Sequence, residues 1–174
     1  MKKQNTYFEF EDKSVATLMY TNEGRLVLYL NRNRPVSSLC MTEEQLKTSA
    51  TKVLEDLYGK DFVSEYTICG VLPPEVTAGS IGTVSFMRRI HGYDTADIIW
   101  VTFDGFELYS INALTVGYMD MASDLTKEEI QAAENYLTQT LKLAPNQYWV
   151  TIDTDGELFL KARTEDAFYW ISIE

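Results

Sequence analysis

The sequence has little of what most catalytic and metal-binding sites are built from. One of its 174 residues is a histidine, His91, and two are cysteines, Cys40 and Cys69. The cysteines form no Cys-x-x-Cys pair, so zinc-binding and dithiol redox motifs are absent. They can form one disulfide, but small buried thiols are the simpler interpretation. Because no nucleophile elbow or phosphate-binding glycine loop occurs either, we expect no enzyme activity, no bound metal and no cofactor.

Basic residues and long apolar runs are scarce as well. The chain has 15 Lys and Arg against 26 Asp and Glu, which gives a formal net charge of −11. A nucleic-acid-binding protein needs a basic stripe to neutralise phosphates, so we expect neither nucleic acid nor an anionic membrane as a partner. No run approaches the roughly 20 apolar residues of a transmembrane helix. The chain opens Met-Lys-Lys with no apolar segment after it, so we expect no export signal within these residues.

Aromatic residues, in contrast, are abundant. They make up 13% of the chain, and aromatic side chains favour β-strands. Apolar and polar residues alternate between turns, as they do in half-buried strands. The clearest stretch is 83–112, which we interpret as three strands joined by a break at 91–97 and a turn at Asp104-Gly105. Further strands are expected at 6–11, 15–21, 25–30, 62–71, 147–152, 157–163 and 167–173, with a turn at Asp155-Gly156.

Two helices are predicted, and each opens on the same capping box. Thr42 with Gln45 and Thr126 with Glu129 have the spacing at which each side chain bonds the backbone of the other residue. The first helix should run from 43 to 58 and end at Gly59, and Pro145 should end the second. Each carries one apolar stripe to bury, formed by Leu46, Ala50, Val53, Leu54 and Leu57 in the first and by Ile130, Ala133, Leu137 and Leu141 in the second.

Part of the sequence reads as an internal repeat. The segment Trp-Val-Thr-Phe-Asp-Gly-Phe-Glu-Leu at 100–108 matches 149–158 with two inserted residues, and 18–26 is a weaker third copy. Two of the three copies follow a Thr-capped helix. A short meander with one apolar face needs a helix to cover it, which makes an α+β layer. We therefore expect three parts: a three-strand meander at 1–41, a first full repeat at 42–118 and a second at 119–174.

The Thr-capped helix, the strand and the long hairpin with its glycine turn resemble the PepSY-like domains, including the tandem PepSY-like repeats of bacterial cell-envelope and sporulation proteins. The segment Val84–Asp97 is similar to the strand and glycine-containing turn before the final hairpin of that family. The resemblance covers 42–112 and, in part, 125–174. It implies an α+β fold of antiparallel sheets, each packed by one amphipathic helix, and an extracytoplasmic location. It also implies a binding or regulatory role without catalysis, such as restraint of a peptidase.

The break at 91–97 is the part of the stretch that the other copies do not share. Polar and aromatic side chains gather at and beside it, and an ordinary turn accounts for them without any ligand. We keep them as a candidate interaction turn, made of Arg88, His91, Tyr93, Asp94 and Asp97.

The function expected from these observations is a non-enzymatic binding or regulatory module of a bacterial cell-envelope protein, with a protein or peptide partner. The alternative is an acidic immunity or inhibitor protein that neutralises a basic partner, which the net charge of −11 favours. The alternative to an extracytoplasmic location is the cytoplasm. An enzyme that uses the segment 88–97 is the third hypothesis and has the least support, since nothing marks a nucleophile.

Overall fold

The structure of the protein is a computed structural model that describes residues 4–9, 15–21, 24–32, 39–74, 80–113, 124–154 and 157–173. The chain divides into two compact units, each with a hydrophobic core of its own. The first unit takes residues 1–87 and 98–117, and the second takes 88–97 and 118–174. Two long strands therefore contribute residues to both units, which no feature of the sequence indicated.

The first unit is built on a sheet with the strand order β1-β2-β3-β7-β6-β5-β4. Its antiparallel pairs include β1 with β2, β2 with β3, β3 with β7, and β6 with β7. The N-terminal meander, expected as a part of its own, thus joins the following sheet through β3 and β7. The strands are β1 (Gln4–Glu9), β2 (Val15–Tyr20), β3 (Leu26–Asn31), β4 (Tyr66–Leu72), β5 (Ile81–Ile90), β6 (Tyr93–Asp104) and β7 (Glu107–Asn112).

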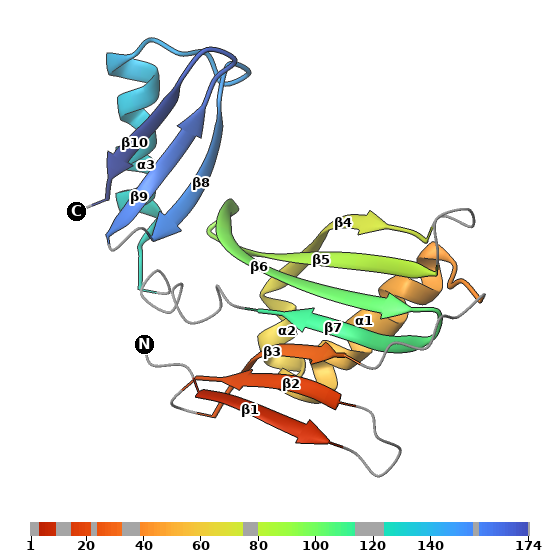
Figure 1. The fold of residues 1–174 in the computed structure, drawn as a ribbon. Helices are drawn as coiled ribbons and strands as arrows, with labels where there is room; N and C mark the ends of the chain where they lie inside the picture. The colour runs from red at the N-terminus through yellow and green to blue at the C-terminus, as the bar shows by residue number, and fades with distance from the viewer. Residues whose placement is uncertain are drawn as a thin grey trace. The chain divides into compact units, whose positions relative to one another are not determined.

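Two helices, α1 (Glu43–Tyr58) and α2 (Lys60–Ser64), lie against one face of this sheet (Figure 1). The predicted bounds of α1 are confirmed, because Thr42 and Gln45 form the capping box and Gly59 follows the last residue with φ +88°. The prediction of a strand from residue 62 is wrong in its first part. Phe62 lies in α2, and its ring packs 5.0 Å from that of Tyr58. A short apolar run does not distinguish a helical turn from a strand, which explains the error.

The core of the first unit lies between α1 and the sheet. From α1 it takes Leu46, Ala50 and Leu54, all fully buried. The prediction that Leu57 belongs to the buried stripe is wrong, since Leu57 is 46% exposed. The sheet contributes every second residue of β5 and β6, as the period of a strand requires. These buried strand residues are Val84, Phe86, Ile99, Val101 and Phe103.

The second unit packs one helix on a smaller sheet. Its strands β8 (Trp149–Thr154), β9 (Leu158–Arg163) and β10 (Phe168–Ser172) pair antiparallel in that order. β8 also pairs with the start of β6, where Asp94 and Thr95 lie beside Thr151 and Ile152. That pairing is parallel, so the expectation of purely antiparallel sheets is wrong and the α+β fold has a mixed sheet. The predicted turn at Asp155-Gly156 lies outside the described residues.

The helix of the second unit is α3 (Lys127–Asn135), which continues as one π-helical turn, Tyr136–Thr140. Its capping box, Thr126 with Glu129, is confirmed, and its predicted stripe packs in the second core. Figure 1 shows α3 against one face of β8, β9 and β10. From the sheet this core takes Ile152, Leu160 and Ala162, each fully buried. The tandem repeat that the sequence suggested stays a prediction.

Candidate functional site

The predicted interaction turn is much shorter than the break at 91–97 that the sequence suggested. Only His91 and Gly92 form the turn, and both have positive φ, at 51° and 89°. Two consecutive residues with positive φ are typical of the type I′ turn, whose twist matches that of the flanking strands. Tyr93, Asp94 and Asp97 lie on β6, and Arg88 lies on β5. The sequence did not indicate a strand at 93–97, because polar residues on both of its faces break the alternation of apolar and polar residues.

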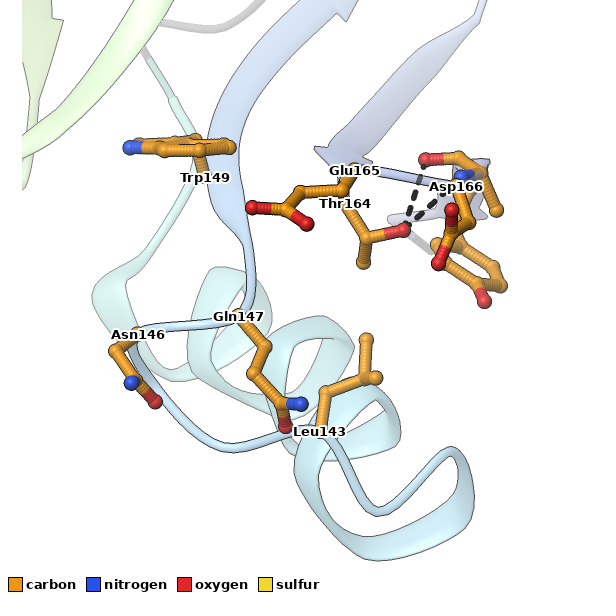
Figure 2. Close-up of a pocket in the computed structure, with 9 residues that line it drawn as sticks. Leu143, Asn146, Gln147, Trp149, Thr164, Glu165 and Asp166 are labelled. Atoms are coloured by element: carbon orange, nitrogen blue, oxygen red, sulfur yellow. Dashed lines mark hydrogen bonds between the residues drawn. The ribbon is translucent and has the colours of Figure 1, made fainter.

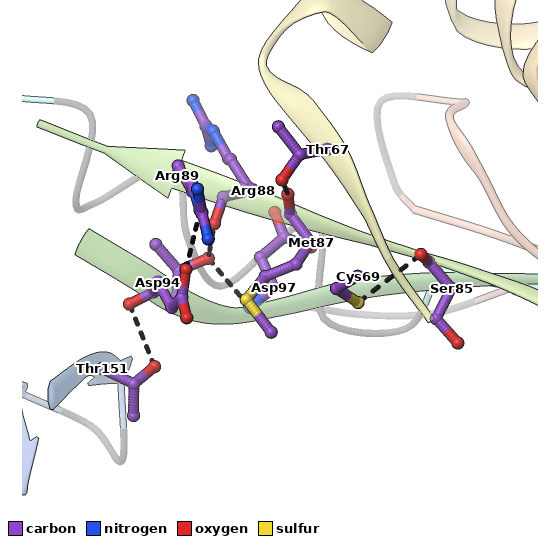
Figure 3. Close-up of polar contacts among 10 residues, drawn as sticks. Thr67, Cys69, Ser85, Met87, Arg88, Arg89, Asp94, Asp97 and Thr151 are labelled. Atoms are coloured by element: carbon purple, nitrogen blue, oxygen red, sulfur yellow. Dashed lines mark hydrogen bonds and ion pairs between the residues drawn. The ribbon is translucent and has the colours of Figure 1, made fainter. Parts of the chain in front are cut away.

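The polar groups near this turn hold the ends of β5 and β6 together. Arg89 forms an ion pair with Asp94 at 2.8 Å, and Thr151 Oγ1 donates to the Asp94 carbonyl at 3.0 Å (Figure 3). Asp97 is fully buried, and its N–H donates to Thr95 Oγ1 at 3.2 Å. His91 Nε2 donates to the carbonyl of Leu125 at 2.7 Å, which ties the turn to the start of α3. A role of these residues in recognition stays a prediction.

A carboxylate held by two tyrosines fixes α3 to the rest of the second unit. Glu134 on α3 accepts hydrogen bonds from Tyr93 on β6 and from Tyr148, the latter at 3.0 Å. Burial, and then the hydrogen bond to Glu134, raises the pKa of Tyr93 to about 12. The pKa of Tyr148 is raised for the same reasons. We call these three residues the Glu134 clamp, and it keeps both phenols protonated to a higher pH than an ordinary tyrosine.

The face of the second sheet that points away from α3 carries large exposed side chains. Strand register places Trp149, Arg163 and Phe168 in one row, and Thr151, Lys161 and Trp170 in the next row on the same side. Because side chains alternate along a strand, this is the side opposite the buried Ile152 and Leu160. Trp149, Phe168 and Trp170 are each more than half exposed. We call the surface formed by Trp149, Lys161, Arg163, Phe168 and Trp170 the aromatic face.

Two cations stack on rings of the aromatic face. The Arg163 guanidinium lies 5.5 Å from the Phe168 ring centre, and Lys161 Nζ lies 5.7 Å from that of Trp170. The rings of Phe168 and Trp170 also stack on each other, at 6.1 Å. Lys161 Nζ is paired with Asp153 at 2.8 Å, which lowers the pKa of that carboxyl. This arrangement keeps the exposed side chains in defined positions, as a recognition surface needs.

A hollow of about 460 Å³ opens beside Trp149, at one end of the aromatic face. It lies between the segment that precedes β8 and the turn that joins β9 to β10 (Figure 2). Figure 2 shows the plane of the Trp149 ring facing the hollow, with the Glu165 carboxylate reaching beneath it. The polar residues that line it are Asn146, Gln147, Thr164, Glu165 and Asp166.

Comparison with known proteins found similarity in structure only. No family model matches the sequence, and no curated protein matches it. The fold is similar to that of the Bacillus megaterium YpeB C-terminal domain, with a TM-score of 0.50 and 12% sequence identity over 99% of this chain and 85% of that one. The likeness supports a PepSY-like fold. At this identity it shows the fold alone.

Three further observations concern the cysteines, the metal-ligating side chains and the helices of the described residues. Cys40 and Cys69 are thiols that form no disulfide with each other. The expectation that both are buried is wrong, since Cys40 is half-buried and Cys69 on β4 is exposed. Within the described residues, His, Cys, Asp and Glu side chains form no group of three or more that would hold a metal ion. No helix in those ranges is long and apolar enough to cross a bilayer.

Sequence reasoning did not single out the aromatic face, although a signal for it exists. Trp149 is two residues from Thr151, and Phe168 is two residues from Trp170, so each pair shares one side of its strand. The side chains between them, such as Val150 and Tyr169, are the ones that pack in the core. A strand with apolar residues on both sides is ambiguous, and only the packing of α3 shows which side stays open.

Proposed function

We propose that this chain is a non-enzymatic binding or regulatory module of a bacterial cell-envelope protein, and that its partner is a protein or peptide bound on the aromatic face. The observation that carries the proposal is the group of three exposed aromatic side chains on β8 and β10, on the side of the sheet opposite α3. Trp149 is 67% exposed, Trp170 56% and Phe168 55%. Large aromatic side chains gathered on one side of a small domain are typical of an interaction site.

The charges on this face indicate the chemistry of the partner. The chain as a whole is acidic, yet Lys161 and Arg163 are the charged side chains that stack on its exposed rings. Trp and Arg are the residues that most often dominate binding energy in protein interfaces. We therefore expect a partner surface with apolar side chains to cover the rings and a carboxylate to meet Arg163.

The regulatory part of the proposal, restraint of a peptidase, is supported by the resemblance of the Thr-capped helices and hairpins to PepSY-like domains. The likeness in fold to the YpeB C-terminal domain is consistent with it. The cell-envelope location rests on the same resemblance. We propose a module without catalysis because the sequence has one histidine, His91. In the structure this histidine donates to a backbone carbonyl.

Site-specific photocrosslinking tests the proposal. A crosslinking amino acid replaces Trp170 on the aromatic face or, as the matched control, the exposed Lys52 on α1, and the full chain is irradiated in bacterial cells. The protein captured only from position 170 is then purified, and its affinity for the chain is measured by calorimetry. We expect the double variant F168A/W170A to weaken binding at least about tenfold, as the removal of interface aromatics typically does.

Three results would contradict the proposal. The first is a captured protein that binds F168A/W170A as well as it binds the unchanged chain. The second is complete release in high salt, since a partner held only by the net charge of −11 would be the basic partner of the inhibitor hypothesis. The third is turnover in a broad screen of hydrolase substrates that is lost on His91→Ala, because it would make the chain an enzyme.

A further inference from the structure

The hollow beside Trp149 is bounded by two short turns that hydrogen bonds hold in place. On one side, Ala144 N–H donates to Gln147 Oε1 at 2.7 Å, and Gln147 N–H donates to the Ala144 carbonyl at 2.9 Å. On the other, Ala167 N–H donates to Thr164 Oγ1 at 3.0 Å, and Thr164 N–H donates to the Ala167 carbonyl at 2.9 Å. A site whose walls are already ordered loses less conformational entropy when a ligand binds, so the hollow is preorganised.

Trp149 differs from the other two exposed rings of the aromatic face. Phe168 and Trp170 are each covered by a cation and stack on each other. Throughout the described part of the chain, no cation or ring stacks in this way on Trp149. Its indole plane faces the hollow instead (Figure 2). An apolar plane is therefore left open at a place where polar side chains converge.

Those polar side chains offer both acceptors and donors. Glu165 and Asp166 are exposed carboxylates at the tip of the turn between β9 and β10. The Gln147 side chain bonds Ala144 through Oε1, which leaves its Nε2 group as a donor. Asn146 adds a second amide to the lining. A ligand that fits must present an apolar plane to the indole and hydroxyl groups around its edge.

We propose that this hollow binds one pyranose ring of a glycan chain. A pyranose with equatorial hydroxyls presents a face of C–H groups, which packs on the indole through apolar and C–H contacts. Its hydroxyls donate to Glu165 and Asp166 in charge-assisted hydrogen bonds and accept from the Gln147 amide. The hollow of about 460 Å³ lies within the size range of small-ligand sites. This site shares Trp149 with the aromatic face, whereas the protein interface proposed above is tested at Phe168 and Trp170.

The same carboxylates would also attract a lysine or arginine side chain, and substitution by amides separates the two ligands. Glu165→Gln with Asp166→Asn removes two negative charges but keeps groups that hydrogen-bond to hydroxyls. A sugar site tolerates this change, whereas a site for a cationic side chain loses its main attraction.

The test uses the full chain and two soluble probes, cellohexaose and chitohexaose, in calorimetric titrations. We expect saturable binding of at least one probe and a loss of at least about tenfold in affinity on Trp149→Ala, as for other central aromatic contacts. Phe106→Ala is the matched control, since it removes an exposed ring of the first unit outside both the hollow and the aromatic face, and it should leave the affinity within about twofold of the unchanged chain. E165Q/D166N should weaken sugar binding by no more than about tenfold, because neutral amides still hydrogen-bond the hydroxyls, though less strongly than carboxylates do.

Several results would overturn the proposal. One is that neither oligosaccharide saturates the chain. Another is binding that Trp149→Ala leaves unchanged, in a variant whose thermal unfolding matches that of the parent chain. A third is saturable binding of a lysine- and arginine-rich hexapeptide that E165Q/D166N abolishes, which would make the hollow a site for cationic side chains. The protein interface is tested separately by F168A/W170A.

Discussion

The Glu134 clamp gives a prediction that the structure makes quantitative. Tyr93→Phe removes one phenol that donates to Glu134 and leaves Tyr148 as the other donor, at 3.0 Å. A hydrogen bond to a charged group contributes about 1.5–3 kcal/mol, and water can partly replace it at a half-buried site, so we expect the variant to lose about 1–2 kcal/mol of stability at pH 7. Tyr136→Phe is the matched control, because that phenol is exposed on the same helix.

The prediction also has a defined dependence on pH. Folding raises the pKa of Tyr93 from 10.0 to about 12, since burial and the hydrogen bond to Glu134 favour the protonated phenol. A group with a raised pKa stabilises the fold fully below its unfolded value, and this contribution is lost as the pH rises from 10 towards 12. The full difference between the folded and unfolded pKa of Tyr93 corresponds to about 2.7 kcal/mol of stability. Because solvent screens a half-buried site, we expect about 1 kcal/mol of stability to be lost over that pH range.

Urea unfolding at a series of pH values measures both effects. Hydrogen exchange of amides in α3 and β9 reports on the second unit, so that unfolding of the first unit does not mask the result. The difference in stability between the unchanged chain and Tyr93→Phe should be largest at neutral pH and shrink as Tyr93 ionises. The reasoning is refuted if Tyr93→Phe matches Tyr136→Phe at pH 7, or if the difference stays constant up to pH 12.

Two further predictions concern the first unit and the start of α3. Gly82→Ala would place a Cβ 2.7 Å from Leu46 Cδ1. The fully buried leucine would have to shift within the core, so we expect a loss of about 1–3 kcal/mol in urea unfolding. Gly70→Ala meets nothing nearer than 3.8 Å and should cost less, so equal losses in the two variants would contradict this account. Thr126→Ala removes the cap that bonds Glu129 and should cost about 1 kcal/mol. It should also raise the pKa of Glu129, because hydrogen bonds from Thr126 lower this pKa in the unchanged chain. An unchanged Glu129 titration by NMR would count against the cap.

The features that could be predicted from the sequence are those whose causes lie within a few residues of chain. Thr42 and Thr126 begin helices because each side chain bonds a backbone N–H three residues on, and Gly59 follows α1 because positive φ suits glycine. The strands of the second unit followed from the alternation between Trp149 and Ser172. Such bonds and periods can be read without knowledge of any distant residue.

Tertiary structure alone decided which elements meet and which surfaces stay open. The parallel pairing of β8 with β6 joins Thr151 to Asp94, which lie 57 residues apart, and no local pattern encodes it. The Glu134 clamp likewise needs α3, β6 and the residue before β8 to come together. The aromatic face exists because α3 covers the other side of the same strands. Burial depends on what packs against a side chain, so the sequence indicated the aromatic residues but not the side on which Trp149, Phe168 and Trp170 remain exposed.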